Sequence, residues 1–210
     1  MQIKSLYNHL LAKHGPQGWW PTRNMGYHPS NKSRKLSEDE MLEICVGAIL
    51  TQNTAWKNVE KALDNLFSAR AMSLRRLSSM PRARLAQLIR SSGYYNQKAE
   101  RLQLFARHVL KEHGSFSRMF KQDLEPLREE LLSLKGIGPE TADSMLLYAG
   151  RKPIFVIDAY TKRICAREGI CKPDVEYHEL QEEFHKQLPP NHKLYNEFHA
   201  LFVEEGKKKQ

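Results

Sequence analysis

The residues whose types and spacing are most specific lie in LLSLKGIGPETADSMLLYA, residues 131–149. Two glycines, Gly136 and Gly138, let the backbone turn sharply and approach a ligand closely. Pro139 suits the first position of a second helix, whose exposed amide groups can bind a phosphate oxygen. An ordinary corner between two helices, with Ile137 filling a core, would show the same pattern. The segment therefore predicts a helical hairpin, with anion binding as its possible chemistry.

Composition limits the class of partner and the compartment. The chain carries 33 Lys and Arg residues against 24 Asp and Glu residues, a formal net charge of +9. A positive net charge suits a partner with phosphate groups. A basic surface that binds no particular partner would have the same net charge. The cysteines, Cys45, Cys165 and Cys171, show no paired spacing, so no disulfide framework is expected. No apolar run suits a signal peptide or a membrane span, which predicts a soluble cytoplasmic protein.

Helices must position these groups, because apolar residues recur at helical spacing almost throughout the chain. The sequence predicts an all-α fold, with the strand-like IFVID at 154–158 as the exception. Ser37 and Glu40 form a capping box that opens one helix, and an apolar stripe at 99–110 marks another that Gly114 ends. Further helices are expected near 55–67, 81–90, 124–133, 139–149, 159–168, 176–187 and 192–205.

Two breaks in the helical pattern indicate how the chain is divided. Residues 15–35 are rich in Gly, Pro, Asn and Ser and are typical of a long loop, a kind of segment that often carries function. A second break lies at 150–153. We therefore predict a helical domain at 36–149, which contains the hairpin. Residues 1–35 and 150–210 are expected to form a second helical lobe, with a central cleft between the two.

These segments resemble a known family. LKGIGPETADSMLLYAGRKPIFVIDAYTKRICAR is similar to the hairpin, loop and aspartate segment of the helix-hairpin-helix DNA glycosylases of the endonuclease III superfamily. GAILTQNT at 47–54 and GYYNQKAERL at 93–102 resemble it as well, in family order over residues 36–206. The resemblance implies a two-lobed helix-hairpin-helix glycosylase fold and a role in base excision repair. Its implied partner is double-stranded DNA that contains a damaged base.

The resemblance implies that Asp158 is the catalytic carboxylate. Cleavage of an N-glycosidic bond passes through a positively charged sugar, which a fixed carboxylate can stabilise while it orients or deprotonates the attacking water. Asp158 could instead simply cap the helix that follows it, and the two roles are compatible. Members that also cut the backbone carry a lysine where this sequence has Glu140. A carboxylate cannot form the imine, and Lys135 lies before the turn, so a monofunctional glycosylase without lyase activity is expected.

Further residues are implied to hold the DNA and the base that is rotated out of the duplex. Gln52 matches the family's gap-filling glutamine, and Tyr94 falls on its wedge loop; a helix-end polar residue and a core aromatic are the alternatives. The hairpin residues expected to contact DNA are Lys135, Gly136, Ile137, Gly138 and Thr141.

The GWWP segment resembles an element of the branch called 3-methyladenine DNA glycosylase III. An alkylated purine is cationic, leaves readily, and attracts an indole face by about 0.5–2 kcal/mol. The resemblance therefore implies hydrolysis of an alkylated purine such as 3-methyladenine. It implies a base pocket of Trp19, Trp20, Pro21 and Glu140. Alternatively, the tryptophans anchor the loop to the core, and Glu140 only complements the helix dipole.

The same residues leave alternative functions open and bear on the cofactors. Uracil or thymine in mismatches, or an oxidised base, are alternative substrates of this fold. A structure-specific DNA-binding module without catalysis is a further alternative, against which Asp158 argues because phosphate binding needs no acid. Most of the superfamily binds an iron-sulfur cluster through four cysteines after the last helix, whereas HALFVEEGKKKQ contains none. We expect no cofactor and no metal, a monomer without membrane contact, nucleoid association through DNA, and a solvated or phosphate-touching tail at Lys207–Lys209.

Overall fold

The computed structural model of the chain describes residues 2–28 and 34–207. The chain divides into two compact units: a hairpin unit, residues 36–145, and a terminal unit, residues 1–35 and 146–210. The described residues contain helices, one isolated β-bridge and no β-strand, which confirms the predicted all-α class. None of these helices combines the length and apolar character that a membrane span needs. Part of the expected loop at 15–35, together with Lys208 and Lys209, lies outside the described residues.

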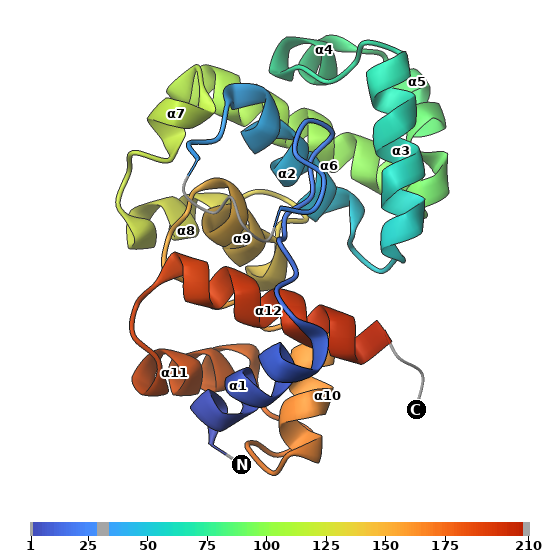
Figure 1. Cartoon of the computed structure of the whole chain (residues 1–210). Coiled ribbons are helices and arrows are strands. Elements are labelled where there is room, and N and C mark those ends of the chain that lie inside the picture. Colours follow the sequence, from blue (N-terminus) through green and yellow to red (C-terminus); the bar gives the residue numbers. More distant parts are fainter. Residues whose placement is uncertain (1, 29–33, 208–210) are drawn as a thin grey trace. The chain divides into compact units, whose positions relative to one another are not determined.

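In the hairpin unit a buried helix, α2, lies at the centre of the others. Residues on nearly every side of α2 are buried, as expected of a helix that is apolar all round, and it packs against α3, α6, α7 and α9 (Figure 1). The predicted capping box is present, since Ser37 and Glu40 each accept a backbone hydrogen bond from the other. The unit contains α2 (Glu38–Leu50), α3 (Trp56–Ser68), α4 (Leu74–Ser79), α5 (Arg82–Leu88), η1 (Arg90–Ser92), α6 (Tyr95–His108), η2 (Val109–His113), α7 (Phe116–Met119), α8 (Leu124–Leu132) and α9 (Pro139–Ser144).

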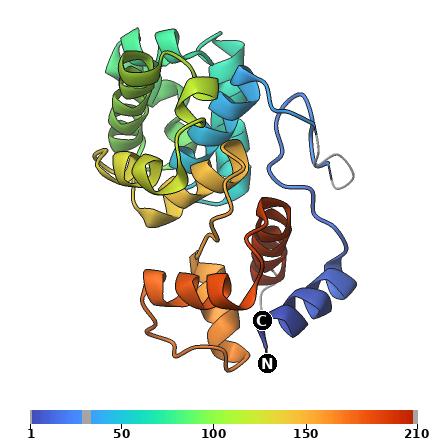
Figure 2. The same ribbon diagram turned by 90° about the vertical axis from the view of Figure 1, so that its left-hand side faces the viewer.

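The terminal unit joins the two ends of the sequence. It contains α1 (Ile3–His14), most of η3 (Met145–Ala149), α10 (Ala159–Arg167), α11 (Tyr177–Gln187) and α12 (His192–Lys207). Helix α1 lies beside α12 in both views, blue against red (Figures 1 and 2). The aromatic core of the unit surrounds Phe155, whose ring stacks on Phe184 with centroids 4.0 Å apart and meets Phe198 edge-on.

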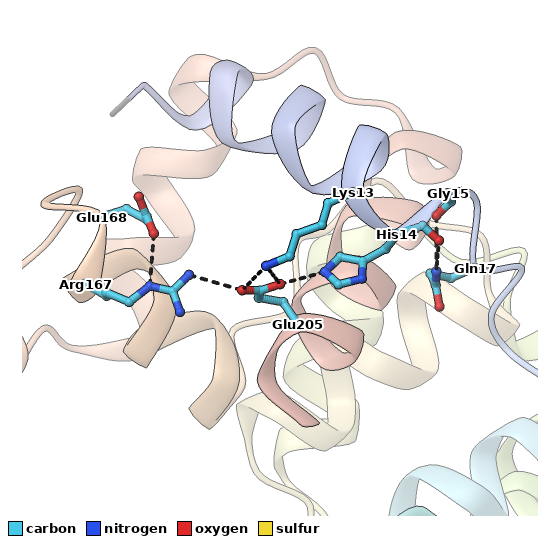
Figure 3. A network of polar contacts seen from close by, with 7 residues as sticks. All are labelled: Lys13, His14, Gly15, Gln17, Arg167, Glu168 and Glu205. Carbon is cyan, nitrogen blue, oxygen red and sulfur yellow. Dashed lines mark hydrogen bonds and ion pairs between the residues drawn. The ribbon is translucent and has the colours of Figure 1, made fainter. Parts of the chain in front are cut away.

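A buried carboxylate links three helices of this unit. Glu205 on α12 contacts Lys13 and His14 of α1 at 2.8 and 2.6 Å (Figure 3). Arg167 of α10 approaches the other carboxylate oxygen at 3.4 Å. Burial by itself raises the pKa of Glu205, but the hydrogen bonds from Lys13, His14 and Arg167 and the charge of Lys13 hold it at about 2. The carboxylate is therefore ionised at neutral pH and ties α1, α10 and α12 together.

The IFVID segment is extended but pairs with no strand. Side chains of α11 replace the missing strand partner: the amide of Phe155 donates to His185 Nε2 at 3.0 Å, and the amide of Ile157 donates to the Tyr177 hydroxyl at 3.3 Å. The amide side chain of Gln181 donates to the Phe155 carbonyl. Residues four apart share one face of a helix. Tyr177, Gln181 and His185 thus present one polar face of α11 to this segment.

The structure differs from the predicted helices in two respects. The helices α1, α4 and α7 were not predicted, and α4 and α7 are too short to show a clear apolar period. The predicted helices at 99–110 and 139–149 both widen into π turns, η2 and η3. Such turns depend on a shift of the hydrogen-bond register, as in the bond from Gly114 N to Val109 O of 2.8 Å, and not on apolar spacing.

Candidate active site

Asp158 occupies the N-cap position of α10 in the terminal unit. Its Oδ1 atom accepts hydrogen bonds from the backbone amide and the hydroxyl of Thr161, at 2.7 and 2.8 Å. Its Oδ2 atom accepts no hydrogen bond from a described residue and faces His199 Nε2 at 3.6 Å. The side chain is 12% exposed. The capping role expected of Asp158 is therefore present, and one carboxylate oxygen is left for another partner.

A buried histidine lies next to this acid, and a buried tyrosine is hydrogen-bonded to the histidine. His199 on α12 shares a 2.6 Å hydrogen bond with the Tyr148 hydroxyl through Nδ1, so its other nitrogen is directed to Asp158. Burial alone raises the pKa of Asp158, but the interaction with His199, followed by that with Thr161, lowers the pKa below its ordinary value. Burial also raises the pKa of Tyr148 well above its usual range. At neutral pH the site thus holds an ionised aspartate and a protonated tyrosine.

The tandem tryptophans pack within the same unit. Trp20 is 6% exposed and meets Tyr148 edge-on, with ring centroids 5.1 Å apart. Trp19 is 7% exposed, lies edge-on to Trp20 and to Tyr27, and has the Lys207 ammonium 5.4 Å from its ring centroid. Both tryptophans therefore anchor the loop, as the alternative interpretation had it, and their role in a base pocket stays a prediction. Trp20 also joins Asp158 through Tyr148 and His199, which brings a predicted pocket residue and the predicted acid into one chain of contacts.

In the hairpin unit, residues outside the hairpin contact the turn between α8 and α9. Gly136 is exposed with a φ of 83°, and a Cβ atom there would overlap the side chain of Arg101. Glycine is thus favoured by the positive φ, and any added Cβ atom would also displace the Arg101 side chain. Gln52 donates to the Gly136 carbonyl at 3.0 Å and to the Thr141 hydroxyl at 2.9 Å, and it accepts a hydrogen bond from Arg101. Gln52 therefore fixes the turn in this structure.

The two helices of the hairpin are also joined by a buried ion pair. Arg128 of α8 contacts both carboxylate oxygens of Asp143 on α9, at 2.7 and 3.2 Å. The Asp143 side chain is fully buried. A bidentate pair restricts the relative orientation of its two partners. Arg128 and Asp143 therefore set the angle between α8 and α9.

The remaining predicted hairpin residues differ in accessibility. Lys135 is exposed and pairs with Glu100 at 2.7 Å, and Gly138 and Glu140 are exposed as well. Ile137 is 5% exposed, and its amide donates to the Leu134 carbonyl at 3.0 Å. Its side chain fills the core beneath the turn, which was the alternative reading of this residue.

Two further predicted residues lie at loop positions. Tyr94 is 64% exposed and adopts a left-handed conformation directly before α6, so it is not the core aromatic of the alternative reading. Pro21 is partly buried beside the tandem tryptophans. The roles of these residues with DNA or a base stay predictions.

Sequence reasoning missed three residues of these sites: Tyr148, His199 and Arg101. His199 lies 41 residues after its partner Asp158, so no local spacing connects them. Arg101 belongs to GYYNQKAERL, which resembles the family, but its contact with Gly136 depends on how α6 packs. The signal that could have identified Arg101 is its positive charge within a segment that resembles the family.

The cysteines are divided between the two units, and the absence of an iron-sulfur cluster stays a prediction. Such clusters take four thiolate ligands in most proteins. Cys45 is buried in α2 of the hairpin unit, while Cys165 and Cys171 belong to the terminal unit. Burial raises the pKa of all three thiols, which disfavours the thiolate form.

Residues 46–190 match the HhH-GPD superfamily of base excision DNA repair proteins. The chain belongs to this family. A protein of Methanocaldococcus jannaschii named "Putative DNA repair glycosylase" is 41% identical over 208 residues, which cover 98% of this chain and 87% of the relative. Endonuclease III of Thermotoga maritima is 30% identical over 175 residues, or 83% of this chain and 77% of the relative. This HhH-GPD protein is therefore a base excision repair DNA glycosylase, and DNA is its substrate.

A solved structure agrees with the fold of the HhH-GPD chain. The crystal structure of H. pylori 3-methyladenine DNA glycosylase bound to 1,N6-ethenoadenine superimposes with a TM-score of 0.79. It is 30% identical and covers 100% of both chains. The predicted helix-hairpin-helix glycosylase fold is confirmed.

Proposed function

We propose that this glycosylase hydrolyses the N-glycosidic bond of an alkylated purine such as 3-methyladenine and leaves the DNA backbone intact. The observation that carries the proposal is Asp158, a buried acid that is held ionised and has one oxygen free of hydrogen bonds from the described residues. In this proposal Asp158 Oδ2 stabilises the positive sugar and orients the attacking water. The enzyme acts as a monomer and without an iron-sulfur cluster.

His199 and Thr161 act on Asp158 as positioning residues. The two Thr161 bonds fix Oδ1, so rotation of the carboxylate is restricted and Oδ2 keeps its direction. The Tyr148 bond orients the imidazole of His199. A preorganised charge stabilises a transition state without the cost of reorganisation at the moment of reaction.

Glu140 supports the absence of lyase chemistry. The lyase reaction needs an amine that attacks the sugar and forms an imine. Glu140, an exposed residue in the first turn of α9, cannot supply one. Lys135 pairs with Glu100 and lies on the other side of the turn, which leaves it a poor substitute.

The aromatic residues support an alkylated base as substrate. Trp20 packs edge-on against Tyr148, within the chain of contacts that ends at Asp158. A cationic purine gains from an aromatic face and leaves without strong protonation, so one aspartate is sufficient for the chemistry. The H. pylori protein, 30% identical over its whole length, is a 3-methyladenine glycosylase bound to 1,N6-ethenoadenine, which supports the same substrate class here.

The test compares duplexes that differ in one base. Duplexes with 3-methyladenine, 1,N6-ethenoadenine, uracil opposite guanine, thymine opposite guanine or 8-oxoguanine are incubated with the protein, and base release is measured separately from strand scission. We expect release of 3-methyladenine, the cationic base, at least tenfold faster than of uracil, thymine or 8-oxoguanine, with no scission, and slower release of the neutral 1,N6-ethenoadenine. Faster release of uracil, thymine or 8-oxoguanine would contradict the substrate class.

A second measurement isolates the lyase question. Borohydride reduces an imine between protein and DNA to a stable adduct, so we expect no adduct during turnover. An E140K variant is the matched comparison, because it restores an amine at the relevant position. A trapped adduct with the unaltered protein would disprove the monofunctional assignment.

A further inference from the structure

A cluster of two histidines and a glutamate lies in the hairpin unit, outside the residues that base release uses. His108 ends α6, His113 ends η2, and Glu130 lies on α8. The Nε2 atoms of both histidines lie 2.6 Å from the same oxygen, Oε1 of Glu130. The ligand atoms of all three lie within 4.8 Å of one another. Three potential metal ligands thus converge on one point.

The π turn η2 brings the two histidines together. Residues five apart point in different directions on a regular α-helix, but a π turn closes i to i+5 hydrogen bonds and aligns them. The bond from Gly114 N to Val109 O, 2.8 Å, has this register. The His108 and His113 rings lie with centroids 5.9 Å apart. The local widening of the helix therefore has a specific result, a pair of imidazoles that both face α8.

A fourth residue orients the carboxylate. Gln122 donates from Nε2 to the Oε2 atom of Glu130 at 2.9 Å, which directs Oε1 to the two histidines. Outer contacts that orient a ligand in this way are a regular part of protein metal sites. The side chains of His108, His113 and Glu130 are 20%, 12% and 22% exposed. The cluster is shielded from bulk solvent yet reachable by an ion.

We propose that His108, His113 and Glu130 bind a divalent transition-metal ion, with Zn²⁺ the best match. Imidazole nitrogens and one carboxylate suit zinc, with water or a further ligand in the fourth position. Zinc bonds of about 2.0–2.1 Å set tetrahedral ligand atoms about 3.3 Å apart. The present 2.6 Å contacts therefore need to lengthen by less than about 1 Å, which rotation of the Glu130 side chain supplies.

The role of the ion is structural. It would link the end of α6 to α8, the first helix of the hairpin, whose turn begins a few residues after Glu130. Helix α6 already contacts this turn through Arg101. A metal bridge between α6 and α8 would thus hold the end of α8 that leads into the hairpin turn. The sequence was expected to bind no metal, an expectation based on the cysteines, and the spacing of His108 and His113 was not considered.

The test measures metal binding by the full chain after removal of metal with EDTA. Zinc is titrated by calorimetry, and cobalt replaces it for absorption spectroscopy. We expect one zinc ion per chain and the visible absorption of a tetrahedral cobalt site without a thiolate band. At free zinc a hundred times the dissociation constant, the melting temperature should rise by about 5–10 °C.

Variants assign the site. Glu130→Gln keeps the length of the side chain and its capacity to accept hydrogen bonds but removes the anionic ligand, so affinity should fall at least tenfold. His113→Gln should have the same effect, and His178→Gln, an exposed residue of α11, should have none. Should the variants fold poorly, the imidazole NMR signals of the unaltered protein should shift for His108 and His113 on zinc addition.

Three outcomes would overturn the site. If zinc binding does not saturate, or if the Glu130 and His113 variants bind zinc as tightly as the unaltered protein, the three residues form a hydrogen-bonded cluster only. A thiolate band in the cobalt spectrum would mean that a cysteine binds the ion instead. Base release is not a readout of this test, so failure of the proposed glycosylase activity would not affect it.

Discussion

Two buried aspartates, one in each unit, are held in different ways. Asp143 in the hairpin unit is fully buried, and one guanidinium, that of Arg128, contacts both of its oxygens. Asp158 in the terminal unit has one oxygen fixed by Thr161, while the other faces His199 beyond hydrogen-bond distance. A fully paired carboxylate can only stabilise the fold. A half-paired one keeps its charge and still has an oxygen to offer to a substrate.

The largest expected effect comes from removing the charge of the half-paired acid. Asp158→Asn should slow single-turnover release of 1,N6-ethenoadenine by about 10²- to 10³-fold, because the stabilising charge at the sugar is lost. Asparagine is also a good N-cap residue, so the melting temperature should change little. Full turnover by this variant would remove the catalytic assignment of Asp158.

The paired acid should show the opposite behaviour. Asp143→Asn leaves the Arg128 guanidinium without its anionic partner and should reduce the free energy of unfolding by about 3–5 kcal/mol, measured with urea. The rate of base release per folded molecule should stay within a few fold. An Arg128→Met, Asp143→Leu double variant is the control, since replacing both charges should recover most of the lost stability. If Asp143→Asn stopped catalysis in fully folded protein, the contrast between the two aspartates would fail.

A third carboxylate extends the comparison within the terminal unit. Glu205→Gln should lower the free energy of unfolding by about 2 kcal/mol at pH 7, since hydrogen bonds to charged groups are lost. The pKa of Glu205 is about 2 when folded, below the unfolded value of about 4.3. Its contribution is therefore complete above the unfolded pKa and disappears as pH falls from there to about 2. The free energies of unfolding of the variant and the unaltered protein, measured with urea, should differ less at pH 3 than at pH 7. An equal difference at both pH values would contradict this role of Glu205.

The smallest effect concerns the residue that faces the half-paired acid. In His199→Gln, burial of Asp158 is no longer offset by the imidazole, so the pKa of Asp158 rises. The acid limb of the pH profile for base release should then move to higher pH, with the alkaline side little changed. A merely structural role for His199 would lower activity equally at all pH values and leave the limb in place.

The sequence predicted the elements but not the contacts between them. The helix after Asp158 and its cap were predictable because both depend on neighbouring residues. The partnership with His199 was not, because it requires α12 to pack beside α10. The hairpin glycines were recognised from their chemistry, whereas the overlap of Gly136 with Arg101 comes from tertiary packing. Local rules thus located the sites, and packing decided which side chains complete them.

The extended IFVID segment has a consequence for the unfolding and association of the protein. Short runs of apolar residues with free backbone amides can add to the edge of another chain's sheet and begin aggregation. Here the amides of Phe155 and Ile157 are occupied by side chains of α11, which covers this edge of the segment while α11 stays docked. Hydrogen-deuterium exchange at these two amides should therefore report the detachment of α11, the step that would expose the protein to self-assembly.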